Sequence, residues 1–560
     1  MYVAPDQKLY QISVNDQEQL DNSKKVTYHC HIFYFCRCIH HLPHSPIFQG
    51  FTRPVTMATF DAKAVVERGR AAFRAGKTRS YEARMKHLSD CHRMIQEHRQ
   101  DFIDAIHKDL KKPAFESNAY EIMMAEKDLV QFMNELEDWI KPVNVSTNLM
   151  TMGKVAYNIW EPLGLSLIIG AWNYPFQLVI EPLVGAMVAG NTAIIKPSEL
   201  SPETALLYER LIPQYLDNDC YQVVNGDAKI TTELLAQKFD HILYTGSGVV
   251  GRIVMAAAAK HLTPVTLELG GKSPVYIDSD TDIDTSVRRV TWGRYMNCGQ
   301  TCVAPDYILC HSRDNDKILK AFRSCIQEFF GDDPQKNPAY ARIVNQRHFK
   351  RISAILEGQN IVIGGKTDES DLYIAPTVIL NPSETAKCMT EEIFGPIISI
   401  FNVDTLDQAI DFINDRDKPL ALYAFSNNQK ILERIARETS SGAFVGNDVI
   451  IHAAIEEMPF GGVGGSGHGA YHGKFSFEVF SHKKPVLIDK HMWFTEKAQS
   501  LRYPPYTPGK ASVAEFFLKK SPKRKGFFYT FLRLTLIGFL LAVVCKAFGV
   551  DKYLPQALKQ

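Results

Sequence analysis

The alternation of short apolar runs with segments of helical length limits the folds open to this chain more than any other feature. Four runs have the length and residue types of buried strands, and they occupy residues 165–170, 192–195, 221–224 and 241–244. Three neighbouring segments have helical length, at residues 179–188, 202–215 and 250–261. This order predicts parallel strands joined by right-handed crossovers. The same alternation over about 267–465 predicts a second α/β domain.

Composition indicates a large globular body and excludes several other classes of protein. Of the 560 residues, 45% are hydrophobic and 22% are charged, which excludes a largely disordered, collagen-like or many-span membrane chain. Lys and Arg number 63 against 62 Asp and Glu, so no overall basic field attracts nucleic acid. The 11 cysteines are mostly scattered, and the chain does not open with an apolar signal segment. We therefore expect a reducing compartment, where cysteines more often serve chemistry than structure.

The first 56 residues differ in composition from the rest of the chain. Residues 29–44 contain three Cys and five His, at spacings that match no zinc-finger pattern. A zinc site is one interpretation of this stretch. We expect instead a disordered extension, since a short Cys/His tract carries only compositional weight. From residue 57 to about 139, apolar residues recur every three or four positions and predict helices.

The C-terminal end combines a cationic cluster with an apolar run. Residues 519–525 contain five Lys and Arg, and residues 526–545 would form a helix of ~30 Å, the thickness of a hydrocarbon core. The one charge in that run, Arg533, lies near its cationic end, where it can reach the headgroups. The charge-free part, 534–545, also has the length of a buried core helix. We expect a membrane anchor at 526–550 with the main body in the cytosol, because the cations lie on its N-terminal side.

A glycine-rich loop is the first candidate for cofactor binding. Gly246–Gly251 has the pattern G-x-G-x-x-G, follows a predicted strand and opens a predicted helix. This is the setting of a dinucleotide phosphate site, although glycine turns of this kind also serve packing alone. The loop follows the fourth strand of its domain rather than the first, so the usual Rossmann pyrophosphate geometry is not assumed.

Two further residues are candidates for the chemistry itself. Glu268 lies in an apolar strand before a glycine turn, where a carboxylate is either a paired core charge or a base with a raised pKa. Cys302 lies between a glycine and a proline, in a loop or helix end where backbone N–H groups favour a thiolate nucleophile. A buried inert cysteine is the alternative. A metal or disulfide unit with Cys298 lacks a second ligand pair, so no metal site is expected.

Seven segments occur in an order that chance does not produce. They are Gly170–Pro175, Lys196–Glu199, Tyr244–Ser247, Leu267–Lys272, Gly299–Cys302, Glu391–Pro396 and Pro459–Gly462. On these motifs the chain resembles the aldehyde dehydrogenase superfamily from about Val65 to Ile488. The hydrophobic tail and Tyr471–Lys474 look most like the membrane-anchored class 3 enzymes of fatty aldehydes. The first 56 residues fit nothing in that family.

The resemblance implies an α/β architecture of several parts. A Rossmann-like NAD-binding domain, an α/β catalytic domain and a bridging β-hairpin are expected, followed by a C-terminal transmembrane helix. The bridging hairpin would pair subunits into a homodimer. The expected boundaries are 1–56 for the extension, 57–140 and 159–266 for the NAD-binding domain, 267–470 for the catalytic domain, 141–158 and 471–492 for the bridging segment, 493–525 for the linker and basic stretch, and 526–550 for the anchor.

The resemblance also implies an activity and its residues. Cys302 would attack a long-chain aliphatic aldehyde to form a thiohemiacetal, whose oxyanion the Asn173 amide and the Cys302 N–H would hold. After hydride leaves to NAD, or alternatively NADP, water deprotonated by Glu268 would hydrolyse the thioester to a fatty acid. The residues implied at the cofactor are Trp172, Lys196, Glu199, Gly246, Ser247, Gly248, Gly251, Glu392 and Phe394. Lys196 and Glu199 would hold the adenosine ribose, and Glu199 favours NAD over NADP.

Two other functions remain open at this stage. A non-catalytic binding or structural role predicts loss of Cys302, Glu268 or Asn173, and all three residues are present. An acylating dehydrogenase that passes its thioester to coenzyme A should not need a glutamate at 268. The expected partners are a long-chain aldehyde, membrane lipid through the C-terminal helix and a second copy of the chain, with no nucleic acid. The expected location is the endoplasmic reticulum membrane.

Overall fold

The structure is a computed structural model, and it describes residues 60–146, 151, 154–489, 496, 499–518, 534, 535 and 538. The predicted extension, with its Cys/His stretch, lies outside these residues. So does the predicted anchor at 526–550, apart from three positions. Within the described part of the chain, no helix is both long and apolar enough to cross a membrane.

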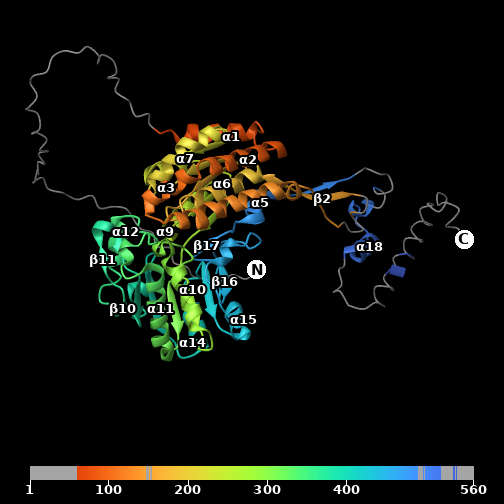
Figure 1. Ribbon diagram of the computed structural model, residues 1–560. Helices are drawn as coiled ribbons and strands as arrows, with labels where there is room; N and C mark the ends of the chain where they lie inside the picture. The colour runs from red at the N-terminus through yellow and green to blue at the C-terminus, as the bar shows by residue number, and fades with distance from the viewer. Residues whose placement is uncertain are drawn as a thin grey trace, which may run out of the picture. The chain divides into compact units, whose positions relative to one another are not determined.

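Helices open the described body, as the apolar spacing predicts. They are α1 (Ala62–Arg74), α2 (Tyr81–Glu97), α3 (Arg99–Leu110), α4 (Ala114–Ser117), the π-helix η1 (Asn118–Ile122) and α5 (Met123–Trp139). Side-chain caps begin two of them, since Asp61 accepts from the Ala64 N–H and Ser80 from the Ala83 N–H. Figure 1 shows α2 and α5 packed beside α6 (Gln177–Ala189).

The first sheet is the predicted parallel one. Its strand order is β17-β7-β6-β3-β4-β5. The bounds are β3 (Leu165–Ile169), β4 (Thr192–Lys196), β5 (Tyr221–Val223), β6 (His241–Thr245), β7 (Val265–Glu268) and β17 (Gly467–His468). All neighbours pair in parallel except β17, which is antiparallel to β7. The crossovers contain α6, α7 (Pro202–Tyr215), α8 (Ala228–Leu235) and α9 (Gly248–Ala259).

Helices cover both faces of this sheet, which explains its continuous apolar strands. Side chains alternate across a strand. Leu167 and Ile169 therefore pack in the core on the side of α1 and α9, whereas Ile168 packs in the core on the side of α2, α5 and α6. All five residues of β3 are buried. With both faces covered, only the strand ends are left to form a site.

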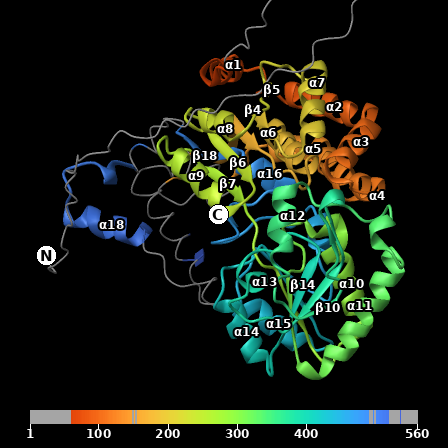
Figure 2. The same cartoon turned by 90° about the vertical axis from the view of Figure 1, so that its left-hand side faces the viewer.

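The second predicted α/β alternation forms a sheet of order β10-β13-β14-β9-β8-β15-β16. The strands are β8 (Pro274–Ile277), β9 (Tyr307–Cys310), β10 (Ile361–Ile363), β13 (Thr377–Leu380), β14 (Ile397–Asn402), β15 (Ala421–Phe425) and β16 (Ala443–Gly446). Only β10 pairs antiparallel. Its main helices are α10 (Ile283–Tyr295), α11 (Asn315–Phe330), α12 (Gln346–Ser353), α14 (Leu406–Asn414) and α15 (Gln429–Glu438). Figure 2 shows α10 and α11 running beside each other.

A two-stranded sheet pairs β11 (Thr367–Asp368) with β12 (Tyr373–Ile374), and the remaining sheet of the described residues is small and antiparallel. It joins β1 (Val143–Asn144), β2 (Val155–Pro162) and β18 (Ser481–Ile488), with β18 at an edge. The helix α16 (Gly473–Val479) precedes β18. Farther along, the segment expected as a linker contains the helix α18 (Pro508–Leu518).

Candidate active site

A cavity of about 230 Å³ lies at the carboxyl ends of β3, β6 and β7. This edge of a parallel sheet is where ligands bind in α/β proteins. Two lining residues end strands of the first sheet, and the others lie in loops or on α12. The lining residues are Ala171, Trp172, Asn173, Thr245, Gly246, Ser247, Glu268, Leu269, Gly270, Cys302, His348, Arg351, Glu392 and Phe394. The cavity thus brings together most of the residues that the motifs single out, although they are spread over more than two hundred positions of sequence.

Glu268 is the last residue of β7 and is buried in this cavity. Neither of its carboxylate oxygens has a hydrogen-bond partner among the described residues. Burial therefore raises the pKa of Glu268 well above its ordinary value. Of the two interpretations of this carboxylate, the paired core charge is excluded for the described residues, and the base with a raised pKa agrees with the geometry.

Cys302 lies half-buried in the loop between the 3-10 helix η3 (Met296–Gly299) and β9. The predicted position in a loop is observed, but the prediction that the surroundings of Cys302 favour its thiolate form is wrong. The backbone N–H groups of Cys302 and Val303 lower the thiol pKa, while burial and the charges of Glu392 and Glu268 outweigh them and raise it to about 12. Cys298 is a second free thiol and is fully buried.

Asn173 is buried in the loop that follows β3. Its side-chain amide donates to the Gln300 carbonyl with an Nδ2–O distance of 3.1 Å. This bond joins the loop of Asn173 directly to the loop of Cys302. A primary amide has two N–H donors, so one remains for a ligand in the cavity.

The segment of Glu392 and Phe394 forms another wall of the cavity. A side chain at Gly270 would meet the Glu392 carboxylate and would displace it from this position. Burial raises the pKa of Glu392 to about 7. The ring of Phe394 meets Trp172 edge-on, with centroids 5.4 Å apart.

Four other predicted cofactor residues do not line this cavity. Lys196 is buried at the end of β4, and its Nζ lies 3.0 Å from the half-exposed carboxylate of Glu199. Gly248 and Gly251 lie in the first turn of α9. A Cβ at Gly251 would come within 2.8 Å of the Leu269 side chain, so this glycine permits close packing of helix against strand.

Two residues that line the cavity were not predicted from the sequence, and both lie on α12. His348 packs against Trp172 with ring centroids 5.1 Å apart. Arg351 donates to the carbonyls of Glu392 and Ile393, at 3.2 and 2.7 Å, and so holds that wall in place. Neither residue belongs to a recognisable motif, and only packing of the two sheets brings α12 to the cavity.

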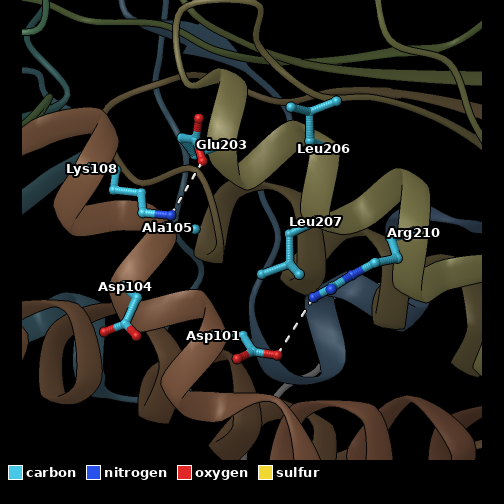
Figure 3. A pocket seen from close by; sticks show the side chains of 8 residues that line it. All are labelled: Asp101, Asp104, Ala105, Lys108, Glu203, Leu206, Leu207 and Arg210. Atoms are coloured by element: carbon cyan, nitrogen blue, oxygen red, sulfur yellow. Dashed lines mark ion pairs between the residues drawn. The ribbon is translucent and has the colours of Figure 1, made fainter. Parts of the chain in front are cut away.

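A larger hollow, of about 380 Å³, lies between α3 and α7. Figure 3 shows its charged side chains paired across it, Lys108 with Glu203 and Arg210 with Asp101. The N–O distances are 3.6 and 3.5 Å. The hollow contains none of the candidate site residues, and four of its five charged side chains are paired with one another, so size alone does not locate the chemistry.

Comparison with known proteins agrees with the geometry of the first cavity. The model of the aldehyde dehydrogenase family matches residues 52–486. The chain belongs to this family. The resemblance inferred from the seven motifs and the prediction of an aldehyde-oxidising enzyme are therefore confirmed. The expectation of NAD or NADP as cofactor is confirmed at the level of the family.

Several aldehyde dehydrogenases are similar over most of their length. Aldehyde dehydrogenase family 3 member A2 of Rattus norvegicus is 50% identical over 479 residues, which cover 86% of this chain and 98% of the relative. The dimeric NADP-preferring aldehyde dehydrogenase of the same species is 49% identical over 440 residues, covering 79% and 97%. Among solved structures, the substrate-bound state of Staphylococcus aureus AldH has a TM-score of 0.80 at 40% identity and covers 82% of this chain and 100% of that one.

Proposed function

We propose that this aldehyde dehydrogenase oxidises long-chain aliphatic aldehydes to fatty acids with NAD, through a thioester on Cys302. The observation that carries the proposal is the juxtaposition in one cavity of a thiol, a buried amide and a buried carboxylate without hydrogen-bond partners among the described residues. These are the groups that nucleophilic acyl chemistry requires.

The first step is attack by Cys302 on the aldehyde carbon. A thiol with a pKa of about 12 is protonated at neutral pH, so its proton must pass to a base as the S–C bond forms. Glu268 accepts this proton, since its unpartnered carboxylate is near enough to raise the thiol pKa. The carbonyl oxygen becomes an oxyanion, which the remaining N–H of the Asn173 amide and the backbone N–H of Cys302 stabilise.

The cofactor site fits a nicotinamide dinucleotide. The cavity is lined by the glycine loop before α9, and Gly270 leaves room for the Glu392 carboxylate. Gly246, Ser247, Gly248 and Gly251 would lie at the phosphates, Trp172, Glu392 and Phe394 at the nicotinamide ribose and ring, and Lys196 and Glu199 at the adenosine ribose. The nicotinamide supplies the hydride acceptor. The half-exposed Glu199 carboxylate repels a 2′-phosphate and so favours NAD.

Hydrolysis completes the reaction. Once Glu268 has passed the thiol proton to solvent, it removes a proton from water and the hydroxide attacks the thioester carbon. The C–S bond then breaks to release the carboxylic acid, and the departing sulfur takes the proton from Glu268 to restore the Cys302 thiol. A raised pKa makes Glu268 a stronger base once it is deprotonated. This use of Glu268 favours hydrolysis over transfer of the acyl group to coenzyme A.

We also propose a homodimer. The outer face of α9 and the turn after it expose apolar side chains, and these are Val249, Val250, Ile253, Met255 and Leu262. Leu262, in the turn, is 92% exposed and Val249, on the helix, is 70% exposed, and large apolar side chains gathered at a surface mark contacts with a partner. A second copy of the chain would cover this face, and one relative is named as dimeric. The small sheet with its edge strand β18 supplies a second surface for pairing.

Substrate class and location are proposed together. The apolar run 526–545 favours an anchor in the endoplasmic reticulum membrane with the body in the cytosol. Each buried methylene contributes ~0.8 kcal/mol, so a sixteen-carbon aldehyde partitions into the bilayer, where an anchored enzyme meets it.

The nucleophile is tested by Cys302→Ala, with Cys298→Ala as the matched control. We expect Cys302→Ala to abolish aldehyde-dependent NADH formation, because no other thiol lines the cavity in the described structure. Cys298→Ala should keep most of the activity, since that thiol is buried outside the cavity. Full activity of Cys302→Ala in an NADH assay would refute the proposed chemistry.

The tail is tested by truncation after Ser500. The shortened enzyme should no longer sediment with membranes. It should lose efficiency on hexadecanal embedded in vesicles while keeping its rate on a water-soluble short aldehyde. If both rates are retained equally, the tail determines location but not access to the substrate.

A further inference from the structure

A fully buried ion pair lies behind Asn173 and has no part in the steps above. The Nζ of Lys112 lies 2.8 Å from Oε2 of Glu121, and both side chains are completely buried. Glu121 belongs to the π-helix η1, a form of helix that often occurs at functional sites. Desolvating two charges is costly, so the contacts of this pair indicate what it is used for.

Lys112 contacts the segment that carries the proposed oxyanion donor. Its ammonium donates one hydrogen bond to the Glu121 carboxylate and another, at 3.0 Å, to the backbone carbonyl of Asn173. The same nitrogen lies 4.0 Å from the ring centroid of Tyr174. An ammonium has three N–H donors, and these three neighbours account for all of them. Glu121 completes the connection, because its Oε1 accepts from the Phe176 N–H at 2.6 Å.

The same carbonyl of Asn173 is also held from the loop of Cys302. Asn297 donates its side-chain amide to it at 2.9 Å and to the Gln300 carbonyl at 3.1 Å. Asn297 and Cys298 have φ angles of 50° and 55°, a conformation that non-glycine residues seldom adopt. Glu116 stabilises this turn by accepting from the Asn297 N–H at 2.9 Å.

We propose that Lys112 is a positioning residue for Asn173: by fixing the Asn173 carbonyl, it sets the place of the Asn173 amide relative to Cys302. Asn297 and Lys112 bind the same carbonyl, so Lys112 holds one of the two points at which these loops are joined, the other being the bond from the Asn173 amide to the Gln300 carbonyl. The inference rests on the proposed function, since Lys112 acts on the reaction only through an oxyanion held by Asn173.

The test is the pre-steady-state burst of NADH formation, normalised to the number of active sites. The variant Lys112→Met/Glu121→Gln removes both charges together, so neither is left buried and unpaired. The amide of the Gln substitution retains an acceptor for the Phe176 N–H. We expect the burst rate constant to fall ~10- to 100-fold, as for a small displacement of a catalytic group, with the dissociation constant of NAD unchanged.

Asn173→Ala separates positioning from a merely structural role. In the Asn173→Ala background, the same two substitutions should change the burst rate constant less than about threefold, since the amide they position is absent. Arg70→Met is the matched control: it breaks the half-buried pair with Asp240, whose atoms are 2.7 Å apart, and should leave the burst unchanged. If the double variant does not fold, Lys112→Arg keeps the charge but alters the donor geometry, and should slow the burst.

The inference would be overturned if the double substitution lowers the burst rate constant equally in the native and Asn173→Ala backgrounds. It would also be overturned if the burst rate constant does not fall in the native background. If Lys112→Arg is the variant used, an unchanged burst would overturn it too. These results leave the proposed function intact provided that Asn173→Ala itself is slow. A normal burst in Asn173→Ala would instead refute the oxyanion role of Asn173, and the inference with it.

Discussion

The two sides of Cys302 differ in how completely their polar groups are paired. On the oxyanion side, the Asn173 amide and carbonyl each bind named partners, and the Lys112–Glu121 pair lies behind them. On the base side, Glu268 has no hydrogen-bond partner among the described residues and its pKa is raised. A donor that must keep its place is stabilised by many contacts. A base that must gain and lose a proton is left without them.

The largest effect is expected from the base side. Glu268→Gln should lower steady-state turnover about 10³-fold, because the amide cannot remove a proton from water. Because Glu268 also accepts the Cys302 proton in the proposed first step, first-turnover NADH formation should slow as well. It should slow less than hydrolysis, since a thiol is more acidic than water, so acyl-enzyme should accumulate. Rapid-quench measurement of the thioester decides this. Turnover like that of the native enzyme would move the base to another carboxylate, and Glu392 would be the first to examine because it lines the same cavity.

The pH dependence of turnover sharpens the same contrast. Since burial raises the pKa of Glu268 well above its ordinary value, a larger share of this carboxyl is protonated and unavailable as a base at a given pH than in an exposed glutamate. When hydrolysis limits turnover, kcat should therefore rise with pH, on the order of tenfold per unit below that pKa. Removing the oxyanion donor by Asn173→Ala should lower the whole profile without shifting it. A flat kcat profile in the native enzyme would contradict the assignment of Glu268.

A smaller effect concerns stability and a third carboxylate, Glu392. Its pKa is about 7 in the folded state and ordinarily about 4.5, so the native state holds the proton over this interval while the unfolded state has lost it. The contribution of Glu392 to folding stability therefore falls as pH rises from about 4.5 to 7, by ~3 kcal/mol.

Glu392→Gln should remove that share of the pH dependence. Urea denaturation at pH 5 and pH 8 should show the variant gaining stability relative to the native enzyme at the higher pH. Lys63→Gln is a suitable control, because Lys63 and its partner Glu67 are largely exposed at the surface. The free energy of unfolding could instead change by the same amount between pH 5 and pH 8 in the native enzyme and in the variant. That result would show that Glu392 is not stabilised in its protonated form.

Most of the strands in the first sheet were predictable because each is a local apolar run. The runs at 165–170 and 241–244 became β3 and β6 within one or two residues, and the helix predicted at 202–215 has the observed bounds of α7. The very short strand β17 was not predictable, since two residues have no recognisable pattern and pair with β7 only in the folded chain. The extension at 1–56 and the anchor at 526–550 stay predictions.

The candidate site was predictable only in part, for a similar reason. Cys302, Glu268 and Asn173 lie in motifs, whereas His348 and Arg351 lie on a helix without one. The sequence also suggested a thiolate-favouring turn at Cys302. Burial and two neighbouring carboxyls, which belong to distant segments, reverse the direction of that pKa shift.

By itself, then, the sequence determined the family, the parallel sheets and the residues that are candidates for chemistry, because motif order and apolar run length are properties of short segments. Only the tertiary structure decided which polar groups are satisfied. Lys112 reaches the Asn173 carbonyl across sixty-one positions, and Asn297 reaches it from the 3-10 helix η3. Burial and hydrogen bonding depend on what packs against a residue, and the sequence near that residue does not contain this information.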